Sequence, residues 1–201
     1  AWMKGIRTIC PEKALEAMIH QTEARHPGIS SVGRDGFGYY DRLGYVPYPE
    51  VHEATAKTLE YAYADWCVAR FADSIGRKEI ADTYYRKALN YRNLYYPDYG
   101  FMWAKDANGK WRDAFDSTEW GGPFTEGSSW HWTWSVLHDP EGLSRLMGGH
   151  AAMEARLDSM FTAPNTYNYG TYGFVIHEIA EMVGLDMGQC AHGNQPVQHA
   201  S

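Results

Sequence analysis

The sequence predicts an all-α fold in which paired helices are joined by long loops, with one short β-hairpin among them. Apolar residues recur at helical spacing in most segments that lie between glycine and proline breakers. Two of these segments are separated by a very short turn, which is typical of an antiparallel helical pair. The other connections are long, polar and aromatic, and this combination suggests a helical solenoid or toroid.

The first predicted helix begins at Pro11, because proline prefers the first turn of a helix. It ends near His26, ahead of the breaker pair Pro27–Gly28. The stretch that follows, residues 31–50, is SVGRDGFGYYDRLGYVPYPE. A glycine-rich loop of this length is usually functional or disordered.

The helical pair is predicted at about residues 53–75 and 78–93. Leu59, Trp66 and Phe71 share one apolar stripe of the first helix. Gly76 separates the two segments, as expected of a glycine that ends a helix.

The β-hairpin is predicted in GFMWAKDANGKWRDAF, where Asn108–Gly109 separates two short aromatic runs. After it, the spacing of apolar residues again predicts helices. These cover about residues 128–137, 141–147, 150–161 and 174–183.

The amino-acid composition excludes some classes of function and favours others. The chain has 201 residues, enough for one domain with its own core. A net charge of −7 argues against nucleic-acid binding, which needs clustered lysine and arginine. No apolar run is long enough to span a membrane. There is no signal-peptide pattern, and both ends read as cut, so we expect a longer parent protein. The surplus of Trp and Tyr suits a core that borders a binding cleft.

HEIAEM, residues 177–182, invites comparison with zinc peptidases. That chemistry needs two histidines four residues apart on one helix, with a glutamate as base. Here Glu181 stands four residues after His177, so one ligand is missing. A helix with polar groups facing a loop or cleft is the better interpretation.

Two short glycine motifs are also ambiguous. GRDG is interpreted as a turn with a local pair between Arg34 and Asp35, because no phosphate-loop Lys-Ser/Thr follows it. GNQP contains Asn194 and Gln195, whose amide oxygens suit hard cations such as calcium. On residue types alone, a polar turn is the simpler interpretation of GNQP.

The most informative acid is Glu126, in WGGPFTEGSSWHWTW. If Ser128 caps a helix, the macrodipole favours the Glu126 anion by roughly 0.3–1 kcal/mol. Burial among the aromatic rings would act the opposite way and favour the protonated carboxyl, which a general acid needs. The residues alone leave two alternatives, a helix-start anion and a proton donor enclosed by rings.

Five stretches together resemble glycoside hydrolase family 92, the calcium-dependent exo-acting α-mannosidases. In order, they are AWMKGIR, GRDGFGYYDRLGYVP, TAKTLEYAYADWCVARFA, FTEGSSWHWTWSVLHDPEGLSRLMGG and MGQCAHGNQPVQH. TLEYAYADWC followed by FTEGSSW and HGNQP is the specific combination. The resemblance implies an N-terminal β-sandwich and an (α/α)6 toroid. Residues 1–201 would then be a partial catalytic toroid, without the β-sandwich and the C-terminal part of the toroid.

The resemblance also implies roles for individual residues in an inverting reaction. Glu126 matches the general acid, and the general base is expected beyond Ser201, so the 201 residues alone are expected to be inactive. Asn194 matches an asparagine near Ca2+, and Gln195 stands where many members have Glu. The calcium would grip O2 and O3 of a terminal mannose. The resemblance implies that His192 and Gly193 contact the leaving group. It implies that Trp130 and Trp132 form part of the pocket wall.

The implied partner is a mannose-containing glycan, and the implied location is secreted, periplasmic or on the surface of a bacterium. Exposed toroid faces would favour self-association. A different class also fits the aromatic surplus and the acidity, namely a non-catalytic helical carbohydrate-binding or scaffold module.

Overall fold

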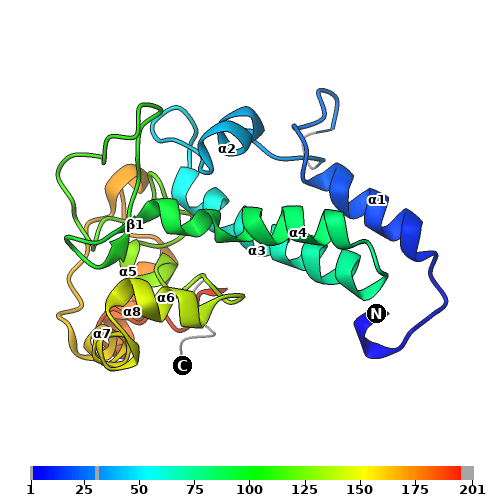
Figure 1. Cartoon of the computed structure of the whole chain (residues 1–201). Coiled ribbons are helices and arrows are strands. Elements are labelled where there is room, and N and C mark those ends of the chain that lie inside the picture. Colours follow the sequence, from blue (N-terminus) through cyan, green and yellow to red (C-terminus); the bar gives the residue numbers. More distant parts are fainter. Residues whose placement is uncertain (1, 30–31, 196–201) are drawn as a thin grey trace.

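The computed structural model describes residues 2–29 and 32–195 and shows a helical protein with one very small sheet (Figure 1). The all-α prediction is therefore confirmed. The helices are η1 (Trp2–Lys4), α1 (Pro11–Gln21), α2 (Phe37–Leu43), α3 (Ala54–Ser74), α4 (Lys78–Lys87), η2 (Ala88–Leu94), α5 (Ser129–Trp132), α6 (Pro140–Met147), α7 (His150–Thr162), η3 (Gly170–Tyr172) and α8 (His177–Leu185). The strands are β1 (Tyr95–Tyr96) and β2 (Phe101–Met102).

The helices α3 and α4 form an antiparallel pair that runs along the longest dimension of the molecule (Figure 1). The turn between them includes Gly76, whose φ of 79° is a left-handed conformation that glycine adopts without strain. The predicted pair is thus confirmed. One detail differs, because the second helix tightens into the 3-10 helix η2 from Ala88 onward.

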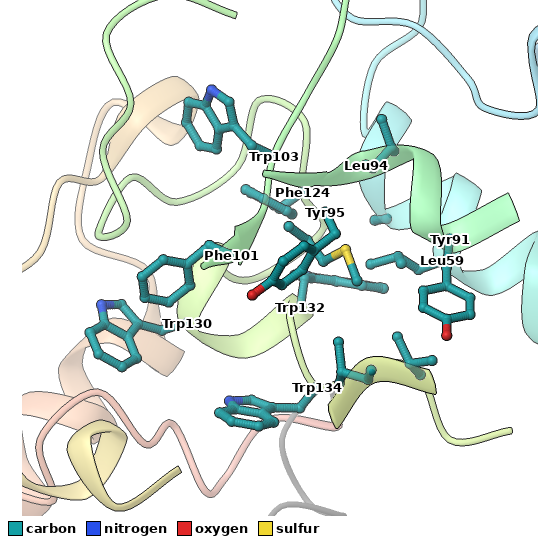
Figure 2. Close-up of a cluster of buried hydrophobic side chains, with 14 of the residues drawn as sticks. Leu59, Tyr91, Leu94, Tyr95, Phe101, Trp103, Phe124, Trp130, Trp132 and Trp134 are labelled. Carbon is teal, nitrogen blue, oxygen red and sulfur yellow. The ribbon is translucent and has the colours of Figure 1, made fainter. Parts of the chain in front are cut away.

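Two apolar clusters hold the two ends of this pair. At one end, α1 places Leu15 against Val68 and Phe71 of α3. At the other end, a larger aromatic cluster joins α3 and η2 to β2 and α5 (Figure 2). In this cluster the rings of Phe101 and Trp130 meet edge to face, with centroids 4.8 Å apart.

Several local predictions were wrong. α1 ends at Gln21 and not near His26, and the long glycine-rich loop contains the helix α2. The β-hairpin forms earlier in the chain than expected. Tyr95 pairs with Met102 and Tyr96 with Phe101, so the chain reverses before the predicted Asn108–Gly109 turn. The predicted Asn108–Gly109 turn exists, but it closes only a single bridge between Lys105 and Trp111.

Side-chain hydrogen bonds explain the difference at the hairpin and a further difference at α5. Asp106 Oδ1 accepts the backbone N–H groups of Asn108 and Lys110 at 2.8 and 2.9 Å, which makes this turn a local side-chain structure. In α5, Thr133 Oγ1 donates to Ser129 O at 2.6 Å and accepts from Met102 N at 3.0 Å. Helix α5 is therefore tied to β2 and ends after four residues, where residues 128–137 had been predicted to be helical.

A buried ion pair attaches the glycine-rich loop to α3. Arg34 Nη2 lies 2.7 Å from Asp65 Oδ1, and their side chains are 4% and 0% exposed. Tyr40 donates its hydroxyl to Asp65 Oδ2 at 2.8 Å. Burial raises the pKa of Asp65, and Arg34 opposes that rise. The predicted pair between Arg34 and Asp35 is wrong, because Asp35 pairs with Lys57 at 2.9 Å.

Arg34→Met should destabilise the protein by about 3–5 kcal/mol, because Asp65 would keep a buried charge without its cation. Urea denaturation followed by circular dichroism measures this loss. Arg25→Met is the matched control. Arg25 is 48% exposed and lies 3.9 Å from Asp35, so its removal should cost less than about 1 kcal/mol. Equal losses in the two variants would contradict the prediction.

Candidate active site

The loop that carries Glu126 is built on the first turn of α3. No side chain caps this turn, so its first N–H groups need other acceptors. Thr55 N and Ala56 N both donate to Pro123 O, at 3.0 and 3.1 Å, and Glu53 N donates to Gly122 O at 3.0 Å. The backbone carbonyls just before Glu126 therefore cap the N-terminal end of α3.

Glu126 itself is held through its backbone. Its N–H donates to the Tyr172 hydroxyl at 2.8 Å, and its carbonyl accepts a hydrogen bond from the side-chain amide of Asn194. The preceding carbonyl, Thr125 O, accepts from Trp132 Nε1 at 2.7 Å. Glu126 has a φ of 43°, an uncommon conformation for a residue other than glycine. Such conformations cluster at functional sites, where surrounding contacts maintain them.

The expected enclosure of the Glu126 carboxylate by aromatic rings is wrong for the described residues. The Glu126 side chain is exposed, whereas the tryptophans around it are buried. Trp120 lies against His131, with ring centroids 4.6 Å apart, and Trp130 packs against Phe101. Trp120 and Trp130 therefore pack into the core beside the loop, and of the four tryptophans in this stretch Trp132 lines the same cavity as Glu126.

His131 links this loop to the segment that carries Asn194. Its Nδ1 accepts from Ser128 N at 2.9 Å, so Nε2 carries the proton that is donated to Gln189 O at 2.9 Å. Complete burial lowers the pKa of His131 to about 4, which keeps the ring neutral. The predicted cap at Ser128 is confirmed, because its hydroxyl accepts from Trp130 N. His131 was missed, although it stands three residues after the cap, where capping-box partners occur.

A cavity of about 260 Å³ lies between α3 and the Glu126 loop. The helix contributes Glu60 and Tyr63, and the other lining residues are Thr125, Glu126, Trp132, Ser135, Leu137 and Gln195. Of the predicted site residues, the structure thus brings Glu126, Trp132 and Gln195 to one cavity. Its wall combines aromatic rings with carboxyl, hydroxyl and amide groups, so it can contact an apolar face of a ligand and form hydrogen bonds with it.

The other predicted site residues lie next to this cavity or behind it. Asn194 is buried beneath the loop, with its amide nitrogen on Glu126 O. His192 and Gly193 are exposed and do not line the cavity, and Trp130 is in the core. A side chain at position 193 would meet the carboxylate of Glu181 on α8, and the flexible Glu181 side chain would have to move to admit it.

The predicted metal ligands are the amide side chains of Asn194 and Gln195. Within residues 2–29 and 32–195, no group of three or more His, Cys, Asp or Glu side chains could hold an ion. Because the Asn194 amide nitrogen is a donor, its Oδ1 faces another way and accepts no hydrogen bond from a described residue. That oxygen and the Gln195 amide have the hard chemistry that calcium prefers. On α8, His177 Nε2 lies 3.1 Å from Glu178 Oε1.

Comparison with known proteins identifies the family to which the chain belongs. The glycosyl hydrolase family 92 catalytic domain matches residues 1–201. The chain therefore belongs to glycosyl hydrolase family 92. The helical architecture and the pair of α3 and α4 agree with the helical toroid that is expected from the sequence.

Two solved structures from Bacteroides thetaiotaomicron are similar over nearly the whole chain. The family GH92 inverting mannosidase BT2199 is 82% identical, with a TM-score of 0.85, and the match covers 100% of this chain and 27% of that protein. The family GH92 alpha-mannosidase BT3965 is 30% identical, with a TM-score of 0.79, over 98% of this chain and 23% of that protein.

A fungal relative is more distant. It is an uncharacterized secreted glycosidase of Arthroderma benhamiae, 27% identical over 79% of this chain and 24% of the relative. The chain thus spans about a quarter of the length of each of these proteins.

The neutral His131 should make stability depend on acid pH. Below pH 6.5 the His131 ring is protonated in the unfolded chain, whereas the folded protein keeps it neutral down to about pH 4. Stability is therefore fully present above pH 6.5 and falls towards pH 4, with a slope of up to about 1.4 kcal/mol per pH unit.

His131→Gln should reduce that slope, measured as the free energy of unfolding in urea at several pH values. His20→Gln changes an exposed histidine on α1 and should retain the slope. An unchanged slope in His131→Gln would contradict the assignment.

Proposed function

We propose that this chain is part of an inverting, calcium-dependent, exo-acting α-mannosidase that removes terminal mannose, in α-1,2 or related linkages, from glycans. One observation carries the proposal. Glu126 is fixed through its backbone N–H and its carbonyl, while its carboxyl forms no ion pair or hydrogen bond with a described residue and lines a cavity that includes Trp132. Membership in the family and the names of the two Bacteroides relatives support the same reaction.

In the proposed reaction, the Glu126 carboxyl gives its proton to the oxygen that leaves C1 of the mannose. Water attacks C1 from the opposite face, and a carboxylate outside residues 1–201 takes the proton of that water. In this role Glu126 donates its proton to the leaving oxygen once in each turnover and is then reprotonated from solvent. The 201 residues supply the acid without the base and should be inactive alone.

We assign supporting roles to the residues around Glu126. Trp132 offers an aromatic surface to the sugar, and its Nε1 fixes the carbonyl of Thr125. Trp130 acts from the core, through its packing on Phe101. His192 and Gly193, exposed beside Asn194, are proposed to contact the leaving group and so to influence linkage preference.

We propose that Asn194 and Gln195 form part of a calcium site. Asn194 Oδ1 and Gln195 Oε1 would hold the ion, and the remaining oxygens would come from elsewhere in the protein and from the substrate. Calcium takes six to eight oxygen ligands, more than these two side chains provide. When bound, the ion would grip the O2 and O3 hydroxyls and favour distortion of the sugar ring.

The remaining proposals concern the whole protein. We propose that it also contains an N-terminal β-sandwich and the rest of the toroid, and that it is secreted, periplasmic or on the surface of a bacterium. None of the helices in the described residues is long and apolar enough to cross a membrane. Phe174, Val183 and Leu185, on α8 and just before it, are exposed apolar residues. Such a surface supports contact with the rest of the protein or self-association.

Glu126→Gln in the complete enzyme should reduce kcat on mannosides with poor leaving groups by about 10²–10⁴-fold, because proton donation is lost. Dinitrophenyl α-mannoside needs little protonation and should be affected much less. Steady-state kinetics on both substrates measures the difference. Glu154→Gln, which changes an exposed acid on α7, is the control and should match the wild type. Wild-type rates on both substrates would refute the role of Glu126.

Removal of calcium with EGTA should abolish activity of the complete enzyme, and calcium should restore it. Gln195→Glu adds a negative charge near the ion and should tighten calcium binding, since affinity rises with ligand charge. Gln195→Ala should weaken binding. Isothermal titration calorimetry with calcium alone measures both shifts. Identical calcium affinities in all three proteins would remove Gln195 from the proposed site.

A further inference from the structure

We propose that Glu60 is a substrate-binding residue of the candidate active site, and that its carboxyl accepts a hydrogen bond from a hydroxyl group of the bound sugar. This inference rests on the proposed function, because it assumes that the cavity beside Glu126 holds a sugar.

The first argument is placement. Glu60 and Tyr63 are three residues apart on α3, so they project from the same face of the helix. Both line the 260 Å³ cavity, opposite the loop that carries Thr125 and Glu126. They also line a second cavity of about 500 Å³ that extends along α3 towards α1. Glu60 therefore stands where the two cavities adjoin, and a ligand can reach it.

The second argument is the absence of a partner. Helix α3 carries three acids. Asp65 pairs with Arg34 and Asp73 pairs with Lys78, but the Glu60 carboxyl forms no ion pair or side-chain hydrogen bond with any described residue. Glu60 is exposed in the described structure, so its carboxyl is open to a ligand. An unpaired acid that lines a cavity is a candidate functional group.

The third argument is the chemistry of the cavity wall. Trp132 and Leu137 offer apolar surface to the face of a sugar ring. Thr125, Tyr63 and Gln195 supply neutral polar groups, and Glu126 has the separate task of proton transfer. A sugar hydroxyl is a donor that binds most strongly to an ionised acceptor. Glu60 is the other carboxyl among the lining residues, so it is the acceptor best suited to that hydroxyl.

The test is kinetic and uses the complete enzyme. Glu60→Gln keeps the shape of the side chain and removes its charge. It should lower kcat/KM on dinitrophenyl α-mannoside about 10- to 100-fold, mainly through KM, as expected for loss of a hydrogen bond to a charged group. Glu79→Gln on α4 makes the same change at an exposed position and should leave the kinetics unchanged. Thermal denaturation confirms that both variants are folded.

A substrate series separates binding from a structural effect. Four monodeoxy α-mannosides, lacking the 2-, 3-, 4- or 6-hydroxyl, are compared in the wild type and in Glu60→Gln. For one of them the two losses should not add, because the hydroxyl and the carboxyl form one interaction.

Additive losses for all four substrates, or an unchanged kcat/KM in Glu60→Gln, would overturn the role of Glu60. A wild-type enzyme that hydrolyses no α-mannoside would instead refute the proposed function itself.

Discussion

The candidate site depends on how the first turn of α3 is closed. A helix begins with N–H groups that have no partner inside the helix, and here the carbonyl of Pro123 accepts two of them. Glu126 follows Pro123 by three residues. This backbone contact therefore places Glu126 near the N-terminal end of α3, at the same cavity as Glu60 and Tyr63. The cavity is the space that remains between the helix and the loop.

Three further side chains hold this arrangement in place without using the Glu126 carboxyl. Tyr172 and Asn194 bind the backbone of Glu126 from two distant parts of the chain. His131, neutral and buried, joins the same loop to Gln189, five residues before Asn194. The loop with the proposed acid and the segment with the proposed calcium ligands are therefore one connected unit. In contrast to the paired Arg34 and Asp65, Glu60 and Glu126 line the cavity and form no ion pair with any described residue.

The sequence predicted those parts of the fold that local patterns determine. The periodicity of 53–75 gave α3 almost to the residue, and Ser128 was correctly interpreted as a cap. Helix α2 was missed because its glycine-rich surroundings resemble a loop. The position of the hairpin was missed because the side chain of Asp106 stabilises the Asn108–Gly109 turn locally.

The candidate site was predicted less completely, because it consists of tertiary contacts. The motifs indicated Glu126 and Asn194, but not that one binds the backbone of the other. Tryptophan rings were expected to enclose the Glu126 carboxyl. Instead, the ring of Trp130 packs against Phe101 and the ring of Trp120 packs against His131, and both contacts join residues that are not neighbours in the sequence. His131 and Glu60 were not identified, since a histidine after a cap and a glutamate on a helix are common.

The anomeric form of the first mannose released by the complete enzyme gives the most direct test of the proposed reaction. Proton NMR can record it before the free sugar equilibrates. If Glu126 protonates the leaving oxygen while water attacks the opposite face of C1, the first product is β-mannose. α-Mannose as the first product would contradict an inverting reaction at this site.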